Sequence, residues 1–195
     1  MDEILPNVGC ELIYHKDYEL VIAVMLSAQT TDASVNRVTE ILFNRYQDLE
    51  SLSKAKLSDI EDIIHSIGLY KNKAKNVLGI AQALVNDYGG VVPSDKDGLQ
   101  KLPGVGNKTA GVIRAEIFKI PDLPVDTHIL RISKRLKFTN ERADAYETEM
   151  ALKKLIPEEK WIRSHHQFIR FGRYICTARS PQCQNCKIAA ICTKK

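Results

Sequence analysis

Apolar residues recur at helical spacing along almost the whole of this 195-residue chain, and this period constrains its fold more than any other feature. Each stripe has apolar residues three and four positions apart, the period of a helix with one buried face. Strand-like alternation is nearly absent, since Gly90-Val91-Val92-Pro93 is short and ends in proline. The sequence therefore predicts an all-α protein, with helices near residues 20–28, 35–46, 57–67, 74–88, 99–102, 108–118, 127–136, 143–155 and 157–175.

Turn and capping residues mark the ends of several helices and one candidate domain boundary. Asp32 is placed to cap the helix that begins there, and Gly68 and Gly89 are placed to end the third and fourth helices. Two prolines interrupt the helical pattern at residues 120–124. We expect the chain to divide there.

Composition agrees with a folded protein and excludes several other classes. Hydrophobic residues make up 44% of the chain, which is enough for a core, and 10 Gly and 7 Pro are too few for collagen or disorder. No apolar run in the sequence approaches the roughly 20 residues that span a bilayer. The acidic start, Met1-Asp2-Glu3, lacks the layout of a signal peptide. We therefore expect a cytoplasmic protein without a membrane segment.

The net charge of +4 conceals an uneven distribution. Residues 131–195 contain 15 Lys and Arg against 6 Asp and Glu, a balance of +9, whereas residues 1–130 balance at −5. The same basic segment holds four of the five cysteines. Because a basic surface attracts polyanions, this division predicts a metal-bearing segment that faces a polyanion such as nucleic acid.

The four clustered cysteines have the character of metal ligands. Their spacing is Cys176-x6-Cys183-x2-Cys186-x5-Cys192, which places four soft ligands within 17 residues. A disulfide framework is disfavoured in a chain without a signal peptide. Four thiolates bind either zinc or an iron–sulfur cluster, and the spacing alone leaves both open. Cys10, far from the others, is interpreted as an ordinary small thiol.

The segment from Leu99 to Ala110 reads as a helix, a tight turn and a second helix. Gly104 and Gly106 permit positive φ and leave backbone N–H groups uncovered, and Asn107 is placed to cap the second helix. Such a helix start binds anions, and a DNA phosphate is the obvious one; a plain helix connection is the alternative. Apolar Leu102 and Val105 are expected to anchor the turn inward.

Two residues near this hairpin have candidate chemical roles. Lys108 lies in the first turn of the second helix, where the helix dipole disfavours a cation and favours an amine nucleophile. A lysine that only touches phosphate is the alternative. Asp126 either caps the helix near Thr127 or presents a carboxylate to Lys108, and both roles are compatible.

Three motifs in a fixed order resemble one family. They are Leu102-Pro-Gly-Val-Gly-Asn-Lys108-Thr-Ala, Val125-Asp126-Thr-His128 and the four-cysteine spacing, and the segments 26–32 and 67–70 agree with them. From about Tyr18 to Cys192 the chain resembles the endonuclease III family of the helix-hairpin-helix DNA glycosylase superfamily.

This resemblance implies two helical domains with a DNA-binding cleft between them. Residues 10–120 would form a six-helix barrel containing the hairpin, and residues 1–9 and 121–195 would form a domain that holds a 4Fe-4S cluster. The implied residue roles are Lys108 as nucleophile, Asp126 as catalytic carboxylate, Gln29 and Leu69 inserted into the duplex beside a flipped base, DNA contacts from Gly104, Val105, Gly106, Thr109 and Arg179, and cluster ligation by Cys176, Cys183, Cys186 and Cys192.

The implied function is base-excision DNA repair. The enzyme would remove oxidised pyrimidines and cut the abasic strand by β-elimination through a lysine Schiff base, acting as a monomer on duplex DNA with damaged pyrimidines or abasic sites. Lys108 favours this reaction over a monofunctional or mismatch-directed glycosylase of the same fold. A non-catalytic DNA-binding module with a metal knot is the alternative from another class. Ser180 and Gln182 leave Arg179 as the one basic residue between the first two cysteines, which predicts a weaker phosphate contact there.

Overall fold

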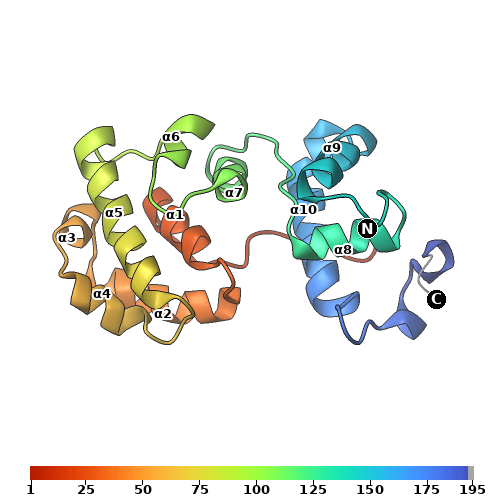
Figure 1. Cartoon of the computed structure of the whole chain (residues 1–195), viewed down its shortest axis with the longest axis horizontal. Coiled ribbons are helices and arrows are strands. Elements are labelled where there is room, and N and C mark those ends of the chain that lie inside the picture. Colours follow the sequence, from red (N-terminus) through yellow and green to blue (C-terminus); the bar gives the residue numbers. More distant parts are fainter. Residues whose placement is uncertain (193–195) are drawn as a thin grey trace. The chain divides into compact units, whose positions relative to one another are not determined.

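A computed structural model of the chain describes residues 1–192, and every regular element in that range is a helix (Figure 1). The chain divides into two compact units. One is Glu11–Phe118, here called the α1–α7 unit, and the other joins Met1–Cys10 to the chain from Lys119 onward, here called the α8–α10 unit. The prediction of an all-α protein is confirmed.

The α1–α7 unit is built around α1 (Asp17–Leu26), which is buried from Tyr18 to Leu26. A helix that is covered on every side belongs in a core. It contacts α2 (Asp32–Arg45), α5 (Tyr70–Tyr88) and α7 (Asn107–Ile117). The other helices of this unit are α3 (Leu49–Ser53), α4 (Leu57–Ile64) and α6 (Lys96–Gln100).

The structure corrects two of the predicted helix ends in this unit and confirms a third. Thr31 caps α2 in place of Asp32, because its hydroxyl oxygen accepts the N–H of Ser34 at 3.3 Å, and Asp32 is the first helical residue. Helix α4 ends at Ile64, so Gly68 lies beyond its end. Gly89 ends α5 in the left-handed conformation, at φ +58°, as predicted.

The α8–α10 unit has a core of its own. Its α-helices are α8 (Thr127–Arg135), α9 (Ala145–Leu155) and α10 (Trp161–Arg170). Buried apolar residues from these helices and the loop before them pack together: Leu123, Val125, Ile129, Ile132, Leu152, Phe168 and Phe171. Short turns complete the unit: η1 (Glu158–Lys160), η2 (Phe171–Ile175), η3 (Cys183–Asn185) and η4 (Ala189–Ile191).

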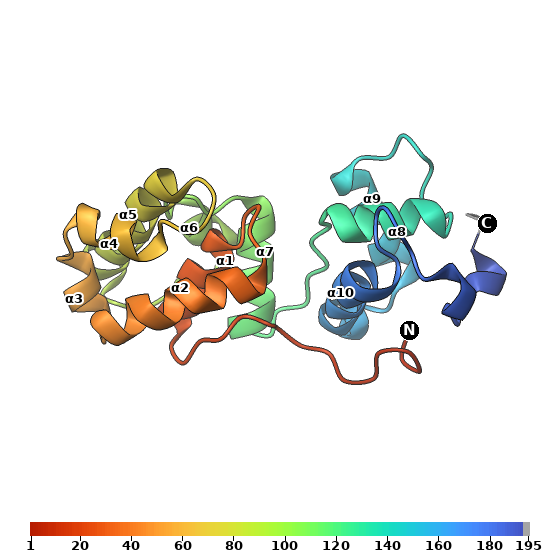
Figure 2. The same cartoon turned by 90° about the horizontal axis from the view of Figure 1, so that it is seen from below.

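The first residues of the chain belong to this unit and run beside α10 (Figure 2). Met1, Ile4 and Leu5 pack on its core. The side chain of Gln167 donates to the Asp2 carboxylate at 2.9 Å and to the Leu5 carbonyl at 3.1 Å. This hydrogen bond from Gln167 lowers the pKa of Asp2.

The helix predicted over 157–175 is divided into three parts, η1, α10 and the π-helical turn η2. In η2 the N–H of Cys176 donates to the Phe171 carbonyl at 2.7 Å. Gly172 lies directly against α8, where an added Cβ would stand 2.8 Å from His128 Cβ. The extra residue in the turn ends the helix at the first cysteine. No helix in residues 1–192 is long and apolar enough to cross a membrane.

Candidate functional site

The connection between α6 and α7 is the predicted hairpin, and its two apolar residues are buried. Leu102 is 2% exposed and Val105 is 5% exposed. Gly104 has φ +76°, in the left-handed region that favours glycine. A Cβ at Gly104 would lie 2.4 Å from Asn76 Nδ2 and 3.1 Å from Met25 Cγ. Backbone conformation therefore strongly favours glycine at position 104, and the neighbouring side chains would have to shift to admit any other residue.

Gly106 has a different role: it does not use the positive φ that glycine permits, and the prediction of a cap at Asn107 is wrong. Gly106 has φ −89° and occupies the N-cap position of α7, whereas Asn107 is the first helical residue. The carbonyl of Gly106 accepts the N–H of Ala110 at 2.9 Å, so the helix starts one residue earlier than expected. Among residues 1–192 no side chain makes a capping hydrogen bond at this end, and apart from the two neighbours in the chain no atom lies within 4 Å of a Cβ added at Gly106. The helix start is thus open to an anion.

Lys108 and Thr109 follow in the first turn of α7. The side chain of Lys108 is exposed, and Thr109 is half-buried. The positive end of the helix dipole lies at this turn and disfavours a protonated amine. Lys108 is therefore placed as predicted, at an accessible helix start directly after the hairpin.

Asp126 is the N-cap of α8, as one of its two predicted roles requires. Its Oδ1 accepts the N–H of Ile129 at 2.8 Å, and the residue is half-buried. The cap fixes the orientation of the carboxylate and retains it as an acceptor. Lys108 belongs to the α1–α7 unit and Asp126 to the α8–α10 unit.

The residues after Asp126 connect α8 to the first cysteine. Burial lowers the pKa of His128, against a smaller opposing effect of the Asp126 charge. A guanidinium nitrogen of Arg131, Nη2, lies 3.2 Å from His128 Nδ1 and donates to the carbonyls of Gly172 at 2.9 Å and Cys176 at 3.0 Å. Arg131 thus joins α8, the helix that Asp126 caps, to the backbone of the cysteine segment.

Gln29 and Leu69, the residues expected to insert into DNA, share an unusual backbone conformation. Gln29 has φ +56° and Leu69 has φ +60°, although neither is glycine. Both side chains are exposed, Leu69 by 62%. Helix α1 ends at Leu26, so Ala28, predicted as part of that helix, lies in the exposed turn that carries Gln29. Strained, exposed residues of this kind concentrate at functional sites.

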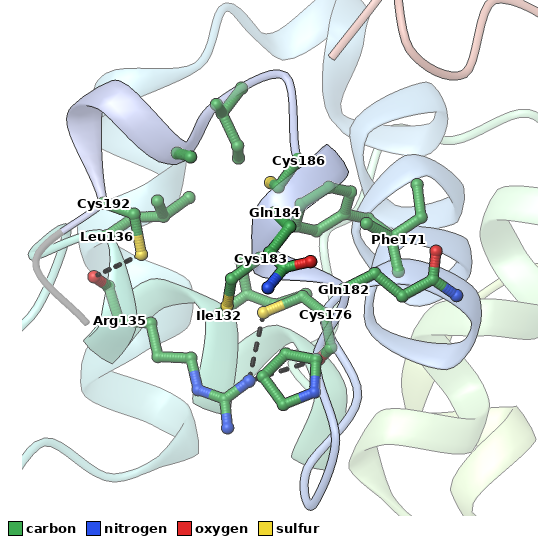
Figure 3. Close-up of a pocket in the computed structure, with 14 residues that line it drawn as sticks. Ile132, Arg135, Leu136, Phe171, Cys176, Gln182, Cys183, Gln184, Cys186 and Cys192 are labelled. Atoms are coloured by element: carbon green, nitrogen blue, oxygen red, sulfur yellow. Dashed lines mark hydrogen bonds between the residues drawn. The ribbon is translucent and has the colours of Figure 1, made fainter. Parts of the chain in front are cut away.

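The four clustered cysteines line one cavity of about 280 Å³, all within the α8–α10 unit (Figure 3). Cys176 follows η2, Cys183 begins η3, and Cys186 and Cys192 follow η3 and η4. The rest of the wall is largely apolar and includes Ile132, Leu136, Phe171, Ile175 and Ile188. The expectation from the cysteine spacing, that the four side chains lie together, agrees with this arrangement.

This cavity fits an iron–sulfur cluster. Four thiol side chains line it, and four cysteine thiolates are the usual ligands of such a cluster. Arg135 Nη1 donates to Cys176 Sγ at 3.1 Å, and such a contact stabilises a thiolate. The donor set and the largely apolar wall therefore suit an iron–sulfur cluster.

Two arginines differ in how well the sequence revealed them. Arg179 is exposed in the loop between the first two cysteines, as expected for a phosphate contact. Sequence reasoning missed Arg135, which donates to the carbonyls of Thr177 at 2.8 Å and Ala178 at 3.0 Å and so holds the start of that loop. Apart from Cys176 Sγ, the acceptors just named are backbone carbonyls, which no residue pattern reveals.

Lys73 was also missed. It is 4% exposed, and it lies on the apolar stripe of α5 with Val77, Ile80 and Leu84. A lysine at a position of the apolar stripe could have indicated a specific role for it, because lysine is seldom buried without a specific reason.

Two family models match the chain. The first, described as the HhH-GPD superfamily base excision DNA repair protein, matches residues 22–158. The second, the iron-sulfur binding domain of endonuclease III, matches residues 176–192 and so includes all four clustered cysteines. Among curated proteins, endonuclease III of Bacillus subtilis is 46% identical over 97% of this chain and 87% of its own length. Endonuclease III of Synechocystis sp. is 40% identical over 98% and 88%.

Solved structures agree with these matches. A trapped endonuclease III–DNA covalent intermediate superposes with a TM-score of 0.94 at 46% identity, covering 98% of this chain and 90% of that one. A non-covalent endonuclease III–DNA complex gives the same values. A thermostable thymine-DNA glycosylase is more distant, with a TM-score of 0.80 at 28% identity, covering 92% and 84%.

Proposed function

This chain belongs to the endonuclease III family of HhH-GPD base excision DNA repair proteins, and from that premise we propose which of its residues perform the reaction. It is a DNA glycosylase and abasic-site lyase that binds DNA and carries a 4Fe-4S cluster. Its substrate class, its site residues and the roles of its two units are the proposal that follows.

Lys108 is the proposed nucleophile, and its exposed position in the first turn of α7 carries the proposal. Its neutral amine attacks C1′ of the damaged nucleotide and displaces the base. The C1′–O4′ bond of the sugar ring then opens, a proton passes from the nitrogen to O4′, and a Schiff base is left at C1′. The imine acidifies the hydrogens on C2′. Removal of one of them breaks the C3′–O bond and cuts the strand.

Asp126 is the proposed catalytic carboxylate. Its role is to accept the proton of the Lys108 ammonium or to stabilise the positive charge that develops on the sugar as the base departs. The cap on α8 supports this role, because one oxygen is anchored by the N–H of Ile129 at 2.8 Å and the carboxylate cannot rotate freely.

The proposed DNA contacts are of two kinds. At the hairpin, the backbone of Gly104, Val105 and Gly106, together with Thr109, binds phosphate without reading sequence, as the open start of α7 suggests. Gln29 and Leu69 fill the space that the flipped nucleotide leaves, and their exposure and left-handed backbone support this role. Arg179 adds a phosphate contact from the loop before Cys183.

The four clustered cysteines are the proposed cluster ligands, and the α8–α10 unit is the proposed cluster domain. A cluster held by the four cysteines would cross-link the last segment, whose turns η3 and η4 are only three residues each. The α1–α7 unit, with the hairpin, is the proposed barrel domain. We propose that the protein acts as a monomer in a bacterial cytoplasm, on duplex DNA with oxidised pyrimidines or abasic sites; the bacterial origin of the endonuclease III relatives supports the bacterial setting.

Strand cleavage of two labelled duplexes tests the proposal. One duplex carries an oxidised pyrimidine and the other an abasic site, and the wild type is compared with Lys108→Gln and Asp126→Asn. We expect the wild type to cut both and Lys108→Gln to cut neither. If Lys108→Gln still cuts the abasic duplex at the wild-type rate, the Schiff-base role of Lys108 is wrong. If the wild type releases the base but leaves the strand intact, the enzyme is monofunctional.

A further inference from the structure

Lys73 is a buried amine that is fully hydrogen-bonded to one short segment of the same unit. Its Nζ donates to the Leu26 carbonyl at 2.8 Å, the Ala28 carbonyl at 2.8 Å and the Thr30 hydroxyl at 2.7 Å. An ammonium group has three protons, so each has an acceptor. The acceptors come from residues 43 to 47 positions earlier in the chain, at the end of α1 and in the turn that follows it.

This burial is energetically unusual. The residue is only 4% exposed, and burial lowers the pKa of its amine. No salt bridge found within residues 1–192 includes Lys73, so its charge faces neutral oxygens alone. A buried charge without a counter-ion is costly. The C-terminal end of a helix offsets part of this cost, because Leu26 is the last residue of α1 and its carbonyl carries partial negative charge.

The segment that Lys73 holds carries Gln29. The hydrogen bonds that the turn makes within itself around Gln29 are long: the N–H of Ala28 donates to the Met25 carbonyl at 3.4 Å, the N–H of Thr30 to the Ser27 carbonyl at 3.1 Å, and the Thr30 hydroxyl to the Ala28 carbonyl at 3.3 Å. Gln29 itself keeps a left-handed φ of +56°, which costs a non-glycine residue about 1 kcal/mol or more. Such a conformation persists only where its surroundings impose it, and the Lys73 amine bonds to residues on both sides of Gln29.

Lys73 is also joined to Leu69. Its backbone N–H donates to the Leu69 carbonyl at 3.0 Å, in the first turn of α5. Leu69, with φ +60°, is the N-cap residue of that helix. The main chain of Lys73 therefore bonds to Leu69, and its side chain bonds to the residues on either side of Gln29.

We propose that Lys73 is a positioning residue that holds the turn of Gln29 in a fixed position relative to Leu69. It thereby determines how efficiently the enzyme acts on a nucleotide that must leave a duplex. The inference rests on the proposed insertion of Gln29 and Leu69 into DNA. Lys73 itself, being buried, does not touch the substrate.

Comparison of a duplex with a single strand separates this role from a general loss of structure. An abasic site in a single strand has no opposite base and leaves no stacked gap to fill, whereas the same site in a duplex has an opposite base and leaves such a gap. Lys73→Met keeps most of the side-chain volume and removes the three donors. We expect it to lower cleavage of an abasic duplex at least 10-fold, as small misplacements of positioning groups do, and to change cleavage of the single strand less than 3-fold.

Three further variants make the test decisive. Lys75→Met removes an exposed lysine two residues along α5 and is expected to leave the duplex to single-strand ratio unchanged. Thr30→Val removes one of the three acceptors of Lys73 and leaves the lysine in place. We expect it to lower the ratio of duplex to single-strand cleavage by a smaller factor than Lys73→Met does. Gln29→Ala lowers the ratio by itself, and the effect of Lys73→Met is then smaller in its presence because the two changes disturb one unit.

The outcomes separate the insertion of Gln29 from the positioning role of Lys73. If Gln29→Ala leaves the ratio unchanged, the proposed insertion of Gln29 is wrong. Suppose that Gln29→Ala lowers the ratio but Lys73→Met lowers duplex and single-strand cleavage by the same factor. The positioning role of Lys73 is then wrong. It is also wrong if the effects of Lys73→Met and Gln29→Ala on the ratio simply multiply in the double variant, because the two residues then act independently. If Lys73→Met does not fold, Thr30→Val decides the question, and an unchanged ratio for that variant overturns the inference.

Discussion

Replacing Gly104 by alanine is expected to destabilise the α1–α7 unit by about 2 to 3 kcal/mol. A residue with a Cβ pays about 1 to 2 kcal/mol in the left-handed region, and Gly104 has φ +76°. The new Cβ would also stand 2.4 Å from Asn76 Nδ2. Because that amide ends a flexible side chain, it turns aside without moving α5, and the overpacking adds about 1 kcal/mol.

Gly106→Ala is the matched control in the same hairpin. Gly106 has φ −89°, and no atom lies within 4 Å of its added Cβ, so we expect a cost of only about 0.5 kcal/mol. Its methyl group would project at the proposed phosphate site at the start of α7. Affinity for an abasic-site duplex should therefore fall roughly tenfold, as for the loss of one hydrogen bond to a charged group.

Urea unfolding followed by circular dichroism measures the first effect, and fluorescence anisotropy with labelled DNA measures the second. The reasoning predicts that Gly104→Ala lowers the unfolding midpoint and that Gly106→Ala lowers DNA affinity at nearly unchanged stability. Equal unfolding midpoints for Gly104→Ala and the wild type would refute the packing argument. Unchanged DNA affinity in Gly106→Ala would refute the phosphate site.

Three other predictions concern pH, the cluster and salt. Burial, followed by the nearby Glu19 and Asp48 charges, raises the pKa of Tyr18 to about 12, so the neutral phenol stabilises the fold below pH 10 and this contribution is lost between pH 10 and 12. Tyr18→Phe should therefore gain roughly 2 kcal/mol on the wild type across that range in urea unfolding, and a constant difference would contradict this. Cys186→Ser should lower iron content and visible absorption while the α1–α7 unit keeps its circular dichroism, because the residues that line the cavity all belong to the other unit; full iron content would remove Cys186 from the ligand set. Arg179→Ala should reduce the slope of log affinity against log salt by about 1, and an unchanged slope would exclude that phosphate contact.

The sequence predicted best those features that depend on side-chain type. The helical stripes, the buried Leu102 and Val105, and the gathering of the four cysteines around one cavity all follow from residue chemistry at a fixed spacing. Helix starts were less predictable, because Thr31 and Asp32 are both good caps and the structure uses the first. At α7 the choice of Gly106 over Asn107 depends on a backbone hydrogen bond, which leaves no trace in residue type.

The residues that sequence reasoning missed share one property. Lys73 and Arg135 each donate mainly to backbone carbonyls of a segment more than 40 positions away. Every residue has such a carbonyl, so the partner sequence gives no signal. Only the fold reveals that both side chains hold the turns on which proposed functional residues lie.

The central claim is that Lys108 forms a covalent bond to the sugar, and borohydride trapping on an abasic duplex tests it most directly. Borohydride reduces a Schiff base to a stable amine, so the enzyme and the labelled strand migrate together in a denaturing gel. We predict a trapped complex with the wild type and with the Lys75→Met control, and none with Lys108→Gln. A complex of wild-type yield with Lys108→Gln, or its absence from an active wild-type enzyme, would contradict the account.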